Sequence, residues 1–304
     1  MDNDGCPSHG WSIIASAMTY SQLAGLLGGF IFSGIVMLFA LRGPKCTKAL
    51  SLFCTTFILL EVDSYLFGLV SGDTQDPHCT RVWSEGMAAC GMFAVGTAGL
   101  FSGICWLLSV RVDSVAPTSS DDHGPRLDLI GSLMVHGTNI SASLLLARTA
   151  FDYLDVIYKQ RASLATALWQ WVYAVPAIVG GTTLILVWHR SRHRTRTSSV
   201  KSDEYQRKWV SFTVYGVIGY GIGGLIFTGA LTNLPDSLWQ HPPLPLVVAT
   251  VAMELLVPGA LLVGLVLTVP SLRQPTRSLT HFAPATPWRS SERPAMRAPG
   301  SYPR

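Results

Sequence analysis

The stretch that decides the fold is residues 244–269, which reads LPLVVATVAMELLVPGALLVGLVLTV and contains Glu254 as its one ionisable side chain. A helix needs about 20 consecutive apolar residues to cross the hydrocarbon core of a bilayer. This stretch is long enough, and Pro270 follows it directly. Six more stretches of the same kind precede it in the chain, at residues 20–41, 49–70, 84–110, 127–149, 165–188 and 209–231. The chain is therefore expected to cross a membrane seven times.

The composition supports the same fold. Hydrophobic residues make up 49% of the 304 residues and charged residues only 13%, and the mean hydropathy is +0.36. A soluble domain has about a quarter of its residues charged, so this chain lacks the side chains to cover a water-exposed globule of 32.9 kDa. A cytosolic enzyme, a secreted disulfide scaffold and a disordered chain are thereby excluded. Because continuous apolar runs span bilayers as helices, we expect an all-α integral membrane bundle of seven transmembrane helices.

The positive charges predict the orientation. If the N-terminus lies outside, 18 of the Lys and Arg residues fall on the inner side and 4 on the outer side. Positively charged loops stay in the cytoplasm, so we expect the N-terminus outside and the C-terminus in the cytoplasm. Tryptophans near the ends of the spans, such as Trp83, Trp106 and Trp239, agree with aromatic belts at the two interfaces. The expected location is a plasma or cytoplasmic membrane, with the lipid bilayer as the main partner.

Three regions are expected along the chain. Residues 1–19 are predicted to form an extracytoplasmic tail, and the absence of Lys and Arg from the first ten residues argues against a cleaved signal peptide. Residues 20–270 form the seven-helix domain. Residues 271–304, with six prolines and six arginines, are predicted to be a disordered cytoplasmic tail. Between spans 4 and 5, residues 150–158 have apolar side chains on one helical face, which favours a short interfacial helix on the outer surface.

Polar side chains deep in the spans mark the candidate site, because each is costly in lipid unless it is paired or hydrated. Glu61 lies near the centre of span 2, Glu254 near the centre of span 7, and His136 within span 4. Asp63 lies about 200° round the helix from Glu61, so these two carboxyls do not form a catalytic pair. Span 4 also carries a polar stripe, formed by Ser132, His136, Asn139 and Ser143. The stripe either packs against other helices through hydrogen bonds or forms one wall of a polar cavity with the two glutamates opposite.

The predicted function is transport or permeation of a small solute or ion through a polar interhelical cavity. Four side chains would line it, namely Glu61, His136, Asn139 and Glu254. The carboxyls would be cation or proton sites, and Pro258 and Gly259 favour a bend in span 7 just after Glu254. The alternative is a membrane sensor, a receptor-like protein or an accessory scaffold subunit that signals through its basic cytoplasmic loop and tail. A membrane enzyme is the least favoured class, and no catalytic residue is assigned.

Two further features concern the ends of the helices. Cys6 and Cys79 are the only cysteines expected outside, where thiols oxidise, so they form either a disulfide or two free thiols. The loop after span 5 is the most basic part of the chain, and it either fixes the topology alone or binds anionic lipid headgroups. The arginines that would contact such lipids are Arg190, Arg192, Arg194 and Arg196. No aromatic residues are interleaved with them for stacking, so nucleic acid is not an expected partner.

Several apparent motifs predict no binding site. Residues 219–224 match a dinucleotide-binding pattern, but no strand precedes them. Glycines four residues apart instead favour close helix packing, and the pairs are Gly25 and Gly29, Gly99 and Gly103, and Gly219 and Gly223. His136 is the one histidine within a span and no span has a central lysine, so neither a metal, a haem nor a retinal cofactor is expected.

Overall fold

The computed structural model describes residues 6–8, 11–40, 44–73, 79–115, 123–159, 162–192 and 199–269. Six long helices come first: α1 (Ile13–Phe39), α2 (Pro44–Gly72), α3 (Cys79–Val115), α4 (His123–Tyr158), α5 (Ala162–Arg192) and α6 (Ser199–Thr232). The seventh crossing consists of α8 (Leu244–Val251), a π-helical turn η1 (Ala252–Leu256) and α9 (Val257–Thr268). The remaining elements are the short helix α7 (Asp236–Gln240) and two strands, β1 (Pro7–Ser8) and β2 (Trp11–Ser12).

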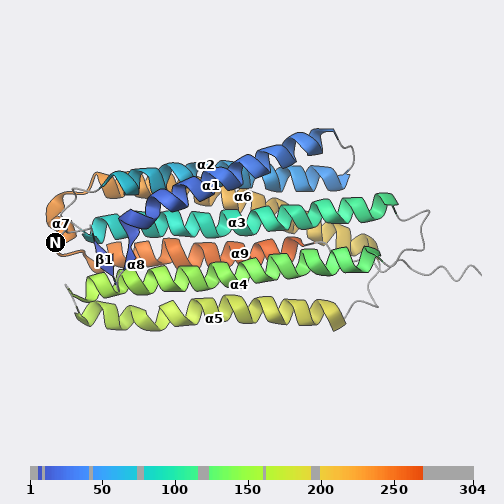
Figure 1. Cartoon of the computed structure of the whole chain (residues 1–304). Coiled ribbons are helices and arrows are strands. Elements are labelled where there is room, and N and C mark those ends of the chain that lie inside the picture. The colour runs from blue at the N-terminus through green and yellow to red at the C-terminus, as the bar shows by residue number, and fades with distance from the viewer. Residues whose placement is uncertain are drawn as a thin grey trace, which may run out of the picture. The chain divides into compact units, whose positions relative to one another are not determined.

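The helices form a membrane bundle. Seven helical segments of the described residues are long and apolar enough to cross a membrane, which confirms the predicted all-α fold of a multi-pass integral membrane protein. The helices run side by side, and α3 lies between α2 and α4 (Figure 1). In α3, 72% of the most apolar window is buried, against 28% in α1 and 29% in α5. Helix α3 is therefore the centre of the core, and α1 and α5 are the most exposed to the surroundings.

Glycines let α2 approach α3 closely. A Cβ on Gly103 would lie 2.8 Å from the Phe53 ring, and one on Gly99 would lie 2.5 Å from a threonine hydroxyl of α2. Both distances are too short for real atoms, so these glycines provide the close packing expected of them. Gly219 and Gly223 differ, because none of the described atoms lies within 4 Å of where their Cβ atoms would be. That pair does not lie in a helix contact.

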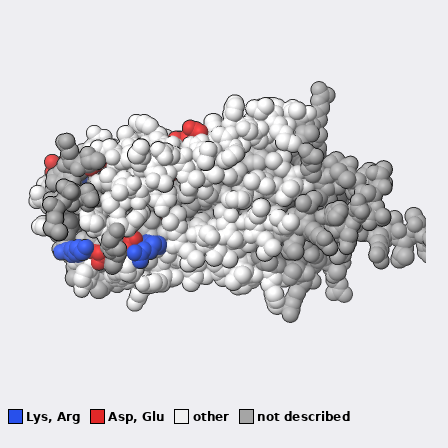
Figure 2. Space-filling model, viewed as in Figure 1, with Lys and Arg blue, Asp and Glu red and all other residues white. Residues whose placement is uncertain are grey.

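The outer surface is apolar, as lipid requires. Large side chains such as Phe30 and Tyr215 are 64% and 74% exposed. On the face shown in Figure 2, the Lys, Arg, Asp and Glu side chains gather mainly at the end that holds α7 and β1, and the rest of the described surface is almost uncharged. The three tryptophans taken to mark the aromatic belts differ from expectation. Trp83, Trp106 and Trp239 are fully buried, so they fill the ends of the core and do not face lipid.

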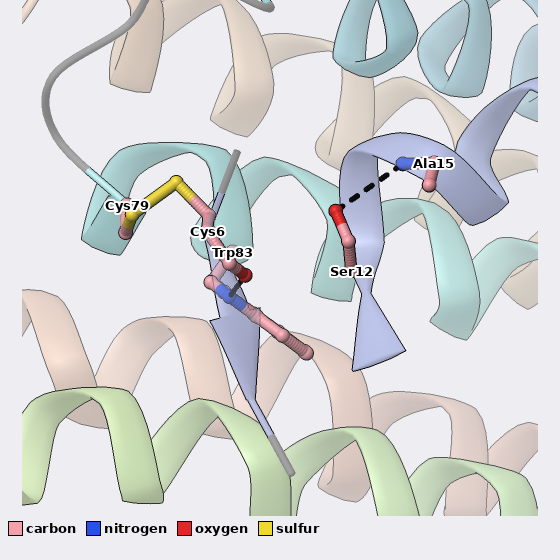
Figure 3. Close-up of a disulfide and its surroundings, with 5 residues drawn as sticks. All are labelled: Cys6, Ser12, Ala15, Cys79 and Trp83. Carbon is pink, nitrogen blue, oxygen red and sulfur yellow. Dashed lines mark hydrogen bonds between the residues drawn. A yellow bond between two sulfur atoms is a disulfide. The ribbon is translucent and has the colours of Figure 1, made fainter. Parts of the chain in front are cut away.

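The N-terminal residues fold onto the bundle. Helix α1 begins at Ile13, seven residues before the predicted start of the first span, and the Ser12 hydroxyl caps it by accepting the Ala15 N–H at 3.3 Å. The preceding strands β1 and β2 pair antiparallel. Figure 3 shows the disulfide between Cys6 and Cys79, which ties this hairpin to the start of α3. Residues 6–8 and 11–19 are thus ordered parts of the bundle, where the sequence predicted a tail.

Side chains hold the hairpin in place as well. The Trp83 indole N–H donates to the Cys6 carbonyl at 3.1 Å (Figure 3), and its ring packs edge-on against Trp11 with 5.3 Å between the centroids. The hydroxyl of Ser8, which is 1% exposed, donates to the Asp155 carboxylate at 3.3 Å. The hairpin therefore covers the adjacent ends of α3 and α4.

Residues 150–158 are the last turns of α4 and not a separate interfacial helix. Tyr153, Leu154 and Ile157 are fully buried, and the Ser84 hydroxyl of α3 donates to the Tyr153 hydroxyl at 3.3 Å. The prediction of an interfacial helix was wrong because an apolar helical face looks the same whether lipid or protein covers it. Here α3 and the hairpin cover it.

Candidate functional site

Glu254 lies in η1, the π-helical turn of the seventh crossing, and its side chain is fully buried. In this turn the Val257 N–H donates to the Ala252 carbonyl, five residues back, whereas an α-helix pairs residues four apart. Single π-helical turns are rare and frequently occur at functional sites. The irregularity predicted beside Pro258 is thus a widened turn that carries the carboxyl.

A tyrosine from another helix completes the hydrogen bonds of this turn. Pro258 has no N–H, so the Met253 carbonyl, five residues earlier, receives no donor from its own helix. The Tyr220 hydroxyl of α6 donates to that carbonyl at 3.1 Å. Gly91 of α3 leaves the space for this arrangement, because a Cβ there would overlap the Tyr220 hydroxyl and lie 3.1 Å from Cγ of Pro258. Three helices therefore fix the turn that holds Glu254.

The Glu254 carboxyl has one bonded and one open oxygen. Thr149 of α4 donates to Oε1, whereas Oε2 is buried and has no hydrogen-bond partner among the described residues. The Thr149 hydroxyl also lies 3.1 Å from two carbonyls of its own helix, those of Leu145 and Leu146. With its single proton, Thr149 donates either to an ionised Glu254 or to its own helix, and in the second case a protonated Glu254 donates to Thr149. The contact suits both protonation states of Glu254.

Asp63 of α2 is the second buried carboxyl. Its side chain is fully buried, and neither carboxyl oxygen has a hydrogen-bond partner within the part of the chain that the structure describes. Cys90 of α3 and Tyr220 each interact electrostatically with both Asp63 and Glu254. We call Asp63, Cys90, Thr149, Tyr220 and Glu254 the buried carboxyl site. None of the ion pairs found among the described residues includes either of its carboxyls.

The buried carboxyl site lies at the middle depth of the bundle. Asp63 is nine residues from Gly72, where α2 ends, and Tyr220 is 12 residues from Thr232, where α6 ends. The other members fall in this range, counted from the same end of the bundle, which carries the disulfide. At about 1.5 Å per residue the depth is roughly 14–18 Å, close to half of a hydrocarbon core of about 30 Å.

Hydroxyl groups extend from this site toward the disulfide. Tyr153 lies one helical turn beyond Thr149 on α4. Its hydroxyl accepts from Ser84 at 3.3 Å, forms a hydrogen bond with Thr250 of α8, and interacts electrostatically with Glu254. The interior between α3, α4 and α8 is therefore polar on the disulfide side of the site.

Of the four residues predicted to line a cavity, Glu254 alone belongs to the buried carboxyl site. Glu61 is exposed on the outer surface of α2, where its carboxyl lies against Gly28 of α1. It therefore does not face Glu254 across an interior cavity, and this placement differs from the prediction. Asp63 occupies the inward face instead, because two residues along a helix turn the side chain by about 200°.

The polar stripe of α4 holds two helices together. Asn139 is 1% exposed and its amide donates to the Leu262 carbonyl of α9 at 2.9 Å. Ser143 donates to the Asn139 carbonyl at 2.8 Å, and His136 is half-buried one turn away. Asn139 is ten residues from Thr149 along α4, which is about 15 Å. The structure thus places the stripe outside the buried carboxyl site.

Asp63, Thr149 and Tyr220 are absent from the site predicted from the sequence. Asp63 was considered only as a partner for Glu61, although two carboxyls on opposite faces of one span mean that one of them points inward. Thr149 and Tyr220 gave no signal, because hydroxyl residues are common in membrane helices and bond to their own backbone.

The basic segment after span 5 is described only in part. Arg190 and Arg192 belong to the last turns of α5, without described side chains, and Arg194 and Arg196 lie outside the described residues. Contact with anionic lipid therefore stays a prediction. In the described ranges, no group of three or more His, Cys, Asp or Glu side chains is placed to hold a metal ion. Comparison with protein-family models, with curated proteins and with solved structures gave no match.

Proposed function

We propose that this chain is a proton-coupled membrane transport protein in which Asp63 and Glu254 carry the protons. The observation that supports this function best is the placement of two fully buried carboxyls on different helices at the middle depth of the bundle, with oxygen atoms that lack partners. An ionised carboxylate without a partner is costly in such surroundings. Each carboxyl therefore gains by taking up a proton, and the transported solute is left open.

The hydrogen bonds around Glu254 support reversible protonation. A purely structural carboxyl would be held by fixed donors, whereas Thr149 has backbone acceptors to which it turns when Glu254 is protonated. Cys90 and Tyr220 lie within electrostatic reach of both carboxyls. A change of charge on one carboxyl is thus felt by the groups that surround the other, which coupled transport requires.

Proton flux into sealed vesicles tests the proposal. The purified protein is reconstituted with a pH-sensitive dye inside, and a potassium diffusion potential, negative inside, drives protons inward. We expect the wild-type protein to acidify the interior. Asp63→Asn and Glu254→Gln should each reduce the rate by about 100-fold, as loss of a proton-transfer group does. Glu61→Gln is the matched control, because it removes a carboxyl from the same helix on its outer surface, and it should leave the rate unchanged.

Two results would contradict the proposal. One is wild-type vesicles that acidify no faster than empty ones under the imposed potential. The other is a rate that Asp63→Asn and Glu254→Gln together leave unchanged. Either result favours the sensor or accessory scaffold, in which the buried carboxyls only hold helices together.

A further inference from the structure

Pro258 leaves one backbone carbonyl without a helical donor, whichever way the seventh crossing is wound. In an α-helical register the missing N–H would have bonded to the Glu254 carbonyl, four residues back, and in a π-helical register to the Met253 carbonyl, five residues back. A buried carbonyl without a donor is destabilising. The register that wins is therefore the one whose open carbonyl finds a donor elsewhere.

The structure shows which register wins and what supplies the donor. The Val257 N–H bonds to the Ala252 carbonyl in the π-helical pattern. The carbonyl left open is then that of Met253, and the Tyr220 hydroxyl donates to it at 3.1 Å. A Cβ on Gly91 would occupy the place of that hydroxyl, so the sequence of α3 also preserves the contact.

We propose that Tyr220 is a positioning residue, whose hydroxyl selects the π-helical register of η1 and thereby directs Glu254 toward Thr149. Conversion of η1 to an α-helical register turns Glu254 by about 100° relative to Pro258 and α9, which is one residue's rotation in a helix. The contact with Thr149 is then lost. Tyr220 also interacts with Asp63, so the hydroxyl that selects the register lies within reach of both carboxyls. This inference deepens the proposed function and rests on it only for the flux measurement.

The infrared band of the Glu254 carboxyl tests the positioning role directly. The band is assigned in membranes of the full-length protein as the signal that disappears in Glu254→Gln. We expect Tyr220→Phe to shift it, because the carboxyl loses its bond to Thr149. Tyr215→Phe is the matched control, since Tyr215 is on the same helix and is 74% exposed, and it should leave the band in place. Proton flux should fall about tenfold in Tyr220→Phe, the factor for about 1.4 kcal/mol of lost register preference.

A change at Pro258 separates register selection from mere packing. Pro258→Ala restores the N–H, so an α-helical register no longer leaves an open carbonyl. We expect Pro258→Ala to shift the Glu254 band in the same direction as Tyr220→Phe, and the double variant to show no additional shift. If Tyr220→Phe does not fold, Pro258→Ala alone still makes this prediction.

The proposal is overturned if the Glu254 band stays in place in Tyr220→Phe and in Pro258→Ala. It is also overturned if the two substitutions shift the band by independent amounts that add. Because the band is read without any flux, a wild-type protein that moves no protons would refute the proposed function and leave this test of Tyr220 intact.

Discussion

Gly91→Ala is the most direct test of how closely the helices meet at the buried carboxyl site. The added Cβ overlaps the Tyr220 hydroxyl and lies 3.1 Å from Cγ of Pro258 and 3.5 Å from Cα of Glu254. Overpacking of a core costs about 1–3 kcal/mol. Displacement of Tyr220 leaves the Met253 carbonyl without its donor, which costs about 1–3 kcal/mol more.

One term opposes this loss. Alanine is favoured over glycine within a helix by up to about 1 kcal/mol. The net destabilisation expected for Gly91→Ala is therefore about 1–5 kcal/mol, from the same overpacking and hydrogen-bond terms. Gly219→Ala is the matched control, because its Cβ meets none of the described atoms within 4 Å, and it should be neutral or slightly stabilising.

Thermal unfolding in detergent measures both variants under the same conditions. We expect a lower Tm for Gly91→Ala than for the wild-type protein, and a Tm for Gly219→Ala equal to or above it. Equal Tm values for Gly91→Ala and Gly219→Ala would refute the packing described here, and with it the argument that Tyr220 reaches η1 through the space left by Gly91.

Three further predictions concern stability. Reduction of the disulfide, or Cys6→Ser, should lower the Tm, since closure of a 73-residue loop is worth up to about 4 kcal/mol by chain entropy; an unchanged Tm after reduction would contradict this. Arg81→Gln leaves Glu85, 2% exposed, without its 3.1 Å ion pair and should cost about 3 kcal/mol or more, whereas Lys159→Gln, from a pair that is 63% and 23% exposed, should cost under about 1 kcal/mol; equal losses in chemical unfolding would refute this ranking. Asn139→Ala removes a bond from α4 to α9 and should lower stability by about 0.6–1.7 kcal/mol, and a neutral result in the same assay would show that this bond contributes nothing.

The crossings were predictable because their signal is local. An apolar run such as 244–269 is visible without knowing what it packs against, and the structure confirms a span there. The start of α1 was not predictable in the same way. Ile13 lies beside Gly86 of α3, where a Cβ would approach its side chain at 2.5 Å, and this tertiary contact extends the helix back toward Ser12. Composition alone placed those residues in a tail.

The site was predictable only to the extent that one residue reports its own cost. Glu254 stood out because a carboxyl inside an apolar helix is expensive anywhere in the bundle. The choice between Glu61 and Asp63 depended on the rotation of α2 about its axis. Both faces of that helix are apolar apart from these two residues, and the face that packs on α3 is decided by glycines such as Gly99, which belong to another helix.

The disulfide has a consequence for the order in which the protein is assembled during synthesis. Cys6 and Cys79 are separated by two crossings, α1 and α2, so both cysteines emerge on the same side of the bilayer whichever way the chain is inserted. Ribosomes add about 5–20 residues per second, which means that Cys6 waits about 4–15 s for its partner at that rate. During that time α1 and α2 are the only crossings available to each other, and the hairpin has no docking surface. The bond therefore closes the N-terminal end only after the first helical pair has entered the membrane, and a chain that inserted α1 without α2 would leave Cys6 free for capture by other thiols.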